Sequence, residues 1–241
     1  SANTLLKHHC IIKGTLQKAV REKMIRYNPA NDVILPKKEK FSGTAYTAAQ
    51  AKSLLQAVED EELKPAVILG LYYGLRRSEV CGLRWQDIDF DAGVMHIQNT
   101  VVKMTSRIEA EQTKSAASRR TMILIPASIP YLEELHQKYL ANPSIDPIGH
   151  VCAHKDGKPY SPDAISQGFK SLLKRHNLPH IRFHDLRHTA GSLLLESGMD
   201  MKRIQSFLGH EDISTTANIY LHLSTEGKRE CANAIGDVLG L

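Results

Sequence analysis

Residues 183–198 read FHDLRHTAGSLLLESG, and this stretch places a group of polar side chains at the start of an apolar segment. Its pattern predicts a helix over residues 184–196. On a helix, residues three positions apart share one face, so His184 and Arg187 would be presented together to a single anionic group. The fold around this helix must therefore bring further polar residues to the same place.

His188 lies four positions after His184, and the resulting HxxxH pattern could suggest a pair of zinc ligands. No third ligand follows at a suitable spacing, and the HExxH glutamate is absent. We therefore expect no metal and no other cofactor.

The composition is typical of a globular protein. The chain has 241 residues, of which 42% are hydrophobic and 24% are charged, enough for one sizeable core or one core with a small appended domain. No apolar run approaches the roughly 20 residues of a membrane span, and the start lacks a signal-peptide pattern. The four cysteines form no CxxC pair, which favours free thiols. We expect a soluble intracellular protein without a membrane partner.

Positive charge is concentrated at the amino-terminal end. Residues 1–40 carry nine Lys and Arg against three acidic residues, a net charge of +6, whereas the other 201 residues carry 22 basic and 23 acidic residues, a net charge of −1. This asymmetry is typical of a protein in which a basic segment binds an anionic polymer and a second, neutral part acts on that polymer. A solvated helix face rich in lysine is the alternative. The candidate contacts are Lys7, Lys13, Lys18, Arg21, Lys37 and Lys38.

Breaks in the pattern divide the chain into two parts. Apolar residues recur near helical spacing over residues 4–26, which predicts one or two amphipathic helices. Prolines, lysines and Ser42-Gly43 then interrupt regular structure, and residues 37–44 are interpreted as a linker. A second part opens at Thr47, where Thr47 and Gln50 form a capping-box pattern.

The second part is predicted to be mainly helical. The expected helices span residues 47–58, 64–73, 77–83, 161–174, 184–196, 200–208, 212–219 and 225–238. Between residues 88 and 125 the runs IDF, VMHIQNTVV and RTMILI favour strands. We expect an α-rich α+β fold with a small three-stranded antiparallel sheet.

Four segments hold polar residues that a helical core does not require. They are GLRRSEVCGLRW (74–85), QTKSAASRRT (112–121), FHDLRHTAGSLLLESG (183–198) and LGHEDISTTANIY (208–220). In this order they resemble the motif set of the tyrosine recombinases, or phage-type integrases. The ending NIYLH is most similar to integrases of conjugative transposons from Gram-positive bacteria. The resemblance implies a catalytic domain over residues 45–241, preceded at residues 1–36 by the last helices of a core-binding domain.

The chemistry explains the residue types. A phosphodiester under attack concentrates negative charge on two non-bridging oxygens, and a planar guanidinium can donate two parallel hydrogen bonds to such oxygens. Arg76 and Arg187 are therefore assigned as the phosphate clamp, whereas Arg77 is interpreted as a possible surface ion pair. Glu79 and Asp185 are expected to brace the segments that carry Arg76 and His184.

The remaining roles are implied by the resemblance. Tyr220 would be the nucleophile, a phenol that needs cationic surroundings and a base because its ordinary pKa is near 10. His184 would be a general acid or base, a role suited to a pKa near neutrality. Lys114, in a turn that Lys103 also flanks, would protonate the departing 5′ oxygen, and His210 would bind the phosphate or brace Tyr220.

The resemblance also implies partners. These are double-stranded DNA, further copies of the chain in a dimer to tetramer, and an accessory excision protein, in the cytoplasm of a bacterium. The segment from Thr225 to Leu241 carries an apolar stripe that could dock on a neighbouring subunit. Two alternatives stay open: a type IB topoisomerase, which reseals the strand that it cuts, and a DNA-binding regulator that has lost catalysis.

Overall fold

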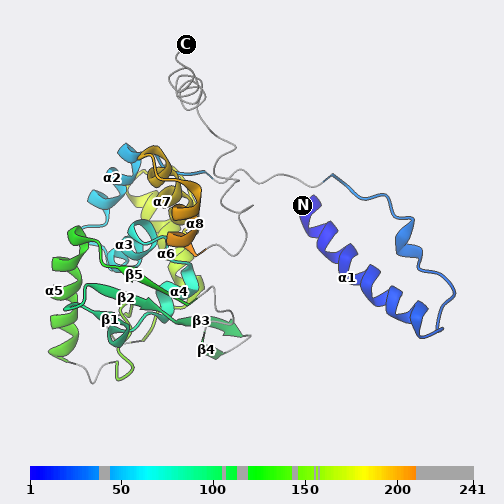
Figure 1. Ribbon diagram of the computed structural model, residues 1–241, viewed down its shortest axis with the longest axis horizontal. Helices are drawn as coiled ribbons and strands as arrows, with labels where there is room; N and C mark the ends of the chain where they lie inside the picture. Colours follow the sequence, from blue (N-terminus) through cyan, green and yellow to red (C-terminus); the bar gives the residue numbers. More distant parts are fainter. Residues whose placement is uncertain are drawn as a thin grey trace, which may run out of the picture. The chain divides into compact units, whose positions relative to one another are not determined.

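The structure is a computed structural model that describes residues 1–37, 44–104, 107–112, 119–142, 146–154, 156 and 158–209. The chain divides into two compact units, Ser1–Gly43 and Thr44–Leu241 (Figure 1). Within the described residues, no helix is both long enough and apolar enough to cross a membrane.

The first unit is built on one helix, α1 (Ala2–Arg21), followed by the short 3-10 helix η1 (Pro29–Asn31). The helix ends before Lys23, whose positive φ of 61° is incompatible with a continuing helix. The returning chain is fastened by Asn28, which donates to the Lys13 carbonyl at 3.0 Å, and by the His9 ring against the Ala30 carbonyl at 2.8 Å. One helix, rather than two, therefore accounts for the predicted amphipathic stretch.

The second unit contains the predicted helices within its described residues. They are α2 (Ala48–Ala57), α3 (Lys64–Tyr72), α4 (Arg77–Gly82), α6 (Pro162–Arg175), α7 (Asp185–Glu196) and α8 (Met201–Leu208), joined by α5 (Ile129–Leu140). The capping box at α2 is confirmed, because Thr47 and Gln50 exchange side-chain to backbone hydrogen bonds. The helices expected at 212–219 and 225–238 lie outside the described residues.

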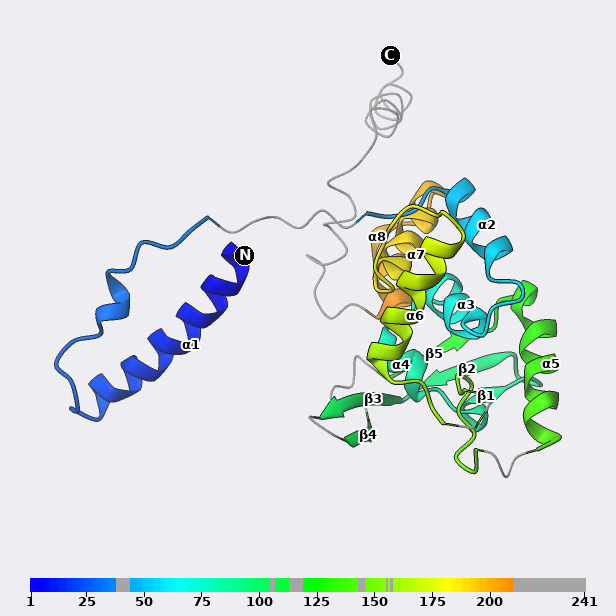
Figure 2. The ribbon, with the colours of Figure 1, turned by 180° about the vertical axis from the view of Figure 1, so that it is seen from behind.

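The three-stranded antiparallel sheet is also confirmed. Its order is β1 (Ile88–Asp89), β2 (Val94–Ile97) and β5 (Arg120–Ile123), with Met95 opposite both Ile88 and Met122. Figures 1 and 2 show α2, α3, α7 and α8 grouped together on one side of this sheet. Helix α3 lies in the core: Ala66 to Leu71 are all buried, and α7 packs against it.

The run VMHIQNTVV is not one strand, which corrects the prediction. It divides into β2 and β3 (Asn99–Met104), and β3 pairs with β4 (Arg107–Gln112) in a separate two-stranded sheet. The chain changes sheets at Gln98 and Asn99, whose side-chain amides donate to the buried carboxylate of Asp87 at 2.6 and 3.1 Å. Strand β4 was missed because its apolar alternation consists of only Ile108 and Ala110, set among charged and polar residues.

The β3–β4 pair is held close to α4, the helix that carries Arg76 at its start. At Gly82 a Cβ atom would lie 2.7 Å from the Asn99 carbonyl oxygen and 2.9 Å from the Thr100 Cα. Both are backbone atoms that cannot move aside without shifting the strand. Glycine at this position is therefore what allows β3 to cross α4 so closely.

We predict that Gly82→Ala destabilises the second unit by about 1–3 kcal/mol, the usual cost of forcing an extra methyl into a packed site. Urea unfolding followed by circular dichroism measures this change. Gly14→Ala is the control, because nothing lies within 4 Å of a Cβ there. Equal stability of Gly82→Ala and the parent chain would show that the close crossing is not a constraint.

Candidate active site

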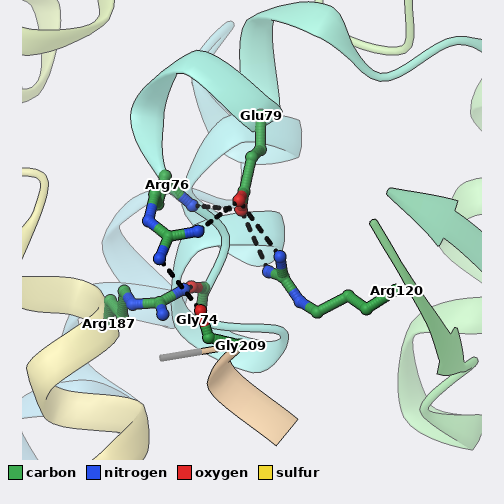
Figure 3. Close-up of polar contacts among 6 residues, drawn as sticks. All are labelled: Gly74, Arg76, Glu79, Arg120, Arg187 and Gly209. Atoms are coloured by element: carbon green, nitrogen blue, oxygen red, sulfur yellow. Dashed lines mark hydrogen bonds and ion pairs between the residues drawn. The ribbon is translucent and has the colours of Figure 1, made fainter. Parts of the chain in front are cut away.

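The centre of the site is the carboxylate of Glu79 on α4, which is 1% exposed. It accepts from the backbone N–H of Arg76 at 2.8 Å and from the Arg76 Nη1 at 2.8 Å (Figure 3). The first contact caps the helix, and the second fixes the direction of the guanidinium group. The expectation that Glu79 braces Arg76 agrees with these contacts.

A second guanidinium binds the same carboxylate from the sheet. Arg120, at the start of β5, donates from Nη1 to Oε1 and from Nη2 to Oε2 of Glu79, both at 3.0 Å. Its side chain is only 9% exposed. Sequence reasoning missed Arg120, although it stands within the segment 112–121 that was singled out for Lys114.

The remaining clamp residue, Arg187, lies beside this pair on α7. It is 1% exposed, and its Nη1 donates to the Gly74 carbonyl at 2.8 Å. The Nη2 of Arg76 donates to the Gly209 carbonyl at 2.9 Å, one residue before His210. The structure thus brings Arg76 and Arg187 into one cluster, and Figure 3 shows both guanidinium groups next to the Gly74 and Gly209 carbonyls.

The cluster keeps a net positive charge. Burial alone would raise the pKa of Glu79, but the hydrogen bonds and charges of Arg120 and Arg76 outweigh it and hold the pKa below its ordinary value. Burial, and then the charge of Arg76, lowers the pKa of Arg187 to about 9, so Arg187 is still protonated at pH 7. Three guanidinium groups and one carboxylate leave a charge of +2, which suits a bound phosphate.

Arg76 also lines a cleft with a volume of about 890 Å³ in the second unit. Other cleft residues include Lys170, Arg182 and His184, which come from α6 and from the segment before α7. Arg77 lies in the same wall and donates to the Ser166 hydroxyl at 2.5 Å. Its Nη1 also lies 3.9 Å from Oδ1 of Asp163, the kind of ion pair that was expected. Lys170 and Arg182 were missed because no motif marks them.

His184 is the N-cap of α7 and is exposed in the cleft, whereas Arg187 points into the protein. Its ring meets the ring of His188 edge-on, with 5.3 Å between centroids. Desolvation in the cleft, followed by the charges of His188 and Arg187, lowers the pKa of His184 to about 4. This pKa is lower than the value near neutrality that was expected, and the imidazole of the free protein is neutral at pH 7.

Asp185 holds the turn that carries His184. Its carboxylate accepts from the backbone N–H of Arg182 at 2.8 Å and from the Arg182 guanidinium at 3.1 and 2.6 Å. The Thr189 hydroxyl donates to the Asp185 carbonyl at 2.9 Å and accepts from the Tyr46 N–H at 3.0 Å. The start of α7 is therefore tied to the segment that precedes α2.

The other predicted site residues divide into two groups. Lys38, Lys114, His210, Tyr220 and the segment from Thr225 to Leu241 lie outside the described residues. The remaining candidate contacts of the first unit, Lys7, Lys13, Lys18, Arg21 and Lys37, are all exposed. The structure nevertheless describes residues next to two of these positions. Gly209 directly precedes His210, and Arg120 lies six residues after Lys114.

A buried cluster of guanidinium groups beside a basic cleft is suited to binding a phosphate group. The model of the phage integrase family matches residues 45–226, and the chain belongs to that family, the tyrosine site-specific recombinases. The chain is therefore an enzyme of site-specific DNA recombination.

Known proteins similar to the chain include XerC of Xylella fastidiosa strain M23, which is 31% identical over 92% of the chain and 71% of that protein. A XerC-like recombinase of Caldanaerobacter subterraneus is 26% identical over 99% of the chain and 67% of its own length. Among solved structures, the Tn1549 transposon integrase in complex with a circular intermediate DNA has a TM-score of 0.81 at 22% identity, covering 97% of this chain and 79% of that one. A lambda integrase tetramer bound to a Holliday junction has a TM-score of 0.65 at 21% identity, covering 88% and 57%.

We predict that the free protein loses stability as the pH falls from about 6.5 to 4. Folding lowers the pKa of His184 from 6.5 to about 4, so in this window the unfolded chain binds a proton that the folded chain does not. Above pH 6.5 the contribution of His184 to the free energy of unfolding no longer changes with pH. Unfolding at pH 7.5, 6.0 and 5.0 measures the dependence, and NMR titration identifies the ring. An unchanged slope in His184→Asn would contradict the lowered pKa.

Proposed function

We propose that the chain cuts DNA by attack of Tyr220 on a backbone phosphate and rejoins it to a different strand. The observation that carries this proposal is the +2 cluster around Glu79, which holds Arg76 and Arg187 together beside a basic cleft. The phenol oxygen forms a bond to phosphorus while the bond to the 5′ oxygen breaks. The product is a 3′-phosphotyrosyl ester, and attack by another 5′ hydroxyl releases the tyrosine.

Each further residue takes one part of the chemistry. The guanidinium groups of Arg76 and Arg187 neutralise the non-bridging oxygens of the pentacoordinate phosphorus. His184, whose imidazole is neutral at pH 7 in the free protein, acts as a general acid or base near the attacking oxygen. Lys114 protonates the departing 5′ oxygen, and His210 holds the phosphate next to Tyr220.

The two units take different parts of DNA binding. We assign residues 1–36 to the end of a core-binding domain, residues 37–44 to a linker and residues 45–241 to the catalytic domain. The exposed basic side chains of α1 bind the phosphate backbone without reading its sequence. In the second unit, Lys170 and Arg182 extend the positive wall of the cleft beyond Arg76.

The biological reaction is integration or excision of a mobile element in the bacterial cytoplasm, with an accessory protein that assists excision. The similarity to the Tn1549 transposon integrase favours this role over DNA relaxation by a type IB topoisomerase. The described motif residues Arg76, His184 and Arg187 are all present, which disfavours a regulator without catalysis.

The test is covalent capture on DNA. The chain is incubated with a pool of nicked duplexes that carry randomised sequence, and SDS-resistant protein–DNA adducts are isolated and sequenced. We expect the parent chain to enrich one family of sites and Tyr220→Phe to form no adduct, because the nucleophilic oxygen is gone. Tyr139→Phe, on α5, is the matched control and should retain adduct formation, because Tyr139 does not line the cleft. Adducts with Tyr220→Phe would assign the nucleophile to another residue.

Assembly on DNA is proposed to use the tail from Thr225 to Leu241. The second unit has an apolar groove of about 360 Å³ on its surface, with Leu55, Tyr72 and Leu193 among its lining residues. The tail carries Ala232, Ile235, Val238 and Leu239 on one side of its predicted helix. An apolar stripe and an apolar groove of the same chain can pair between neighbouring subunits in a closed ring.

We predict that removal of residues 226–241 leaves binding of one subunit intact but abolishes dimers and tetramers on the selected duplex. Gel-shift and light-scattering measurements separate these species. A finer test is Ile235→Asp, which places a charge on the apolar stripe, against Asn233→Asp, which adds the same charge on the opposite side. Unchanged assembly after the deletion would rule out the tail as the link.

A further inference from the structure

We propose that Arg120 is a positioning residue of the recombination site, which sets the direction of the Arg76 guanidinium through the carboxylate of Glu79. The inference rests on the proposed function, because it assigns Arg120 to the same strand-cleavage reaction. Arg120 does not line the cleft, so we assign it a role through Glu79 and not a contact with the reacting phosphate.

The first observation is the way that Arg120 occupies Glu79. Its two terminal nitrogens bind one carboxylate oxygen each, so the planar fork fixes the plane of the carboxylate. Both side chains are nearly withdrawn from water, with exposed fractions of 9% and 1%. Water therefore cannot replace either partner, and the orientation of Glu79 depends on Arg120.

The second observation is what this leaves to Arg76. Only its Nη1 reaches Glu79, while its Nη2 turns to the Gly209 carbonyl. Without Arg120, each carboxylate oxygen could accept a further hydrogen bond from the fork of Arg76, with Oε2 still held by the Arg76 backbone N–H. A bidentate pair between the two side chains is the stronger arrangement. Arg76 would then rotate towards Glu79 and away from both the Gly209 carbonyl and the cleft.

The third observation is the contact between Arg120 and Gly209. A Cβ atom on Gly209 would lie 2.9 Å from the Arg120 Cδ, and Gly209 has a left-handed φ of 66°. The side chain of Arg120 thus passes against the residue that precedes His210. One arginine therefore joins α4, β5 and the end of α8, the three segments that carry or adjoin Arg76, Lys114 and His210.

An ordinary buried ion pair would also stabilise the fold, so the test must separate stability from positioning. Arg120→Lys keeps the positive charge, but a single ammonium cannot hold both carboxylate oxygens in one plane. The matched control is Arg175→Gln, which removes an arginine from an exposed pair with Glu61 on another part of the unit. Arg175 does not line the cleft, and its hydrogen-bond partner is Glu61 and not Glu79.

The first measurement is the first-order rate of adduct formation at saturating protein, on the duplex selected from the randomised pool. We expect Arg120→Lys to lose about a hundredfold in this rate, the scale of a misplaced catalytic group, with DNA affinity within about threefold of the parent. Arg175→Gln should stay within about twofold. A rate for Arg120→Lys equal to that of the control would overturn the proposal.

The second measurement needs no DNA. The Nε–H signal of Arg76 is assigned in nitrogen-15 NMR spectra from its loss in Arg76→Lys. We expect this signal to shift and to exchange faster with water in Arg120→Lys, but to stay unchanged in Arg175→Gln. If the parent chain forms no adduct, the proposed function fails, while this signal still decides whether Arg120 positions Arg76.

A double variant covers the case in which Arg120→Lys does not fold. Glu79→Gln with Arg120→Gln removes both buried charges together, and we expect it to cleave no more slowly than Glu79→Gln alone, within about threefold. If the second substitution causes no further loss of rate, the effects of the two substitutions are non-additive, as expected for two residues that act together. Independent, multiplying losses from the two substitutions would show that Arg120 does not act through Glu79.

Discussion

One carboxylate, withdrawn from water between two guanidinium groups, connects the segments that form the site. Glu79 ties α4 to β5 through Arg120 and orients Arg76, and Arg76 in turn holds the end of α8 by the Gly209 carbonyl. Breaking a buried ion pair by removal of one partner typically costs about 3–5 kcal/mol, because the remaining charge stays desolvated. The geometry of the site and the stability of the unit therefore have the same origin.

The same cluster explains why its cations are arginines. Burial beside other positive charges lowers the pKa of Arg187 to about 9, which still leaves it protonated at neutral pH. A lysine begins from an ordinary pKa about two units lower, so the same surroundings would remove much of its charge. A guanidinium therefore keeps its charge among these buried cations, and a phosphate bound beside the cluster would offset part of its net positive charge.

The sequence predicted those features whose signals are local, and it missed those that depend on distant partners. The capping box at Thr47 involves residues three apart, and Arg76 stands in a recognisable motif, so both were found. Arg120 was missed because its partner Glu79 is 41 residues away and nothing in its neighbourhood indicates burial. Lys170 joins the cleft only when α6 is folded against α4, and the strand at 107–112, with only two apolar residues, is recognised by its pairing with β3. Each missed feature depends on a contact between segments that are distant in the sequence, and the spacing of apolar residues within one segment cannot reveal such a contact.

The low pKa of His184 links the protonation of this imidazole to the binding of DNA. In the free protein, the cleft and its cationic neighbours keep this imidazole neutral. A phosphate placed beside it would cancel part of that repulsion and raise its proton affinity, and thermodynamic linkage makes such an effect reciprocal. DNA would then enter together with a hydrogen ion, and mild acidity would tighten the complex while it weakens the empty fold. His184 would thus take up a proton from solvent only when DNA is bound.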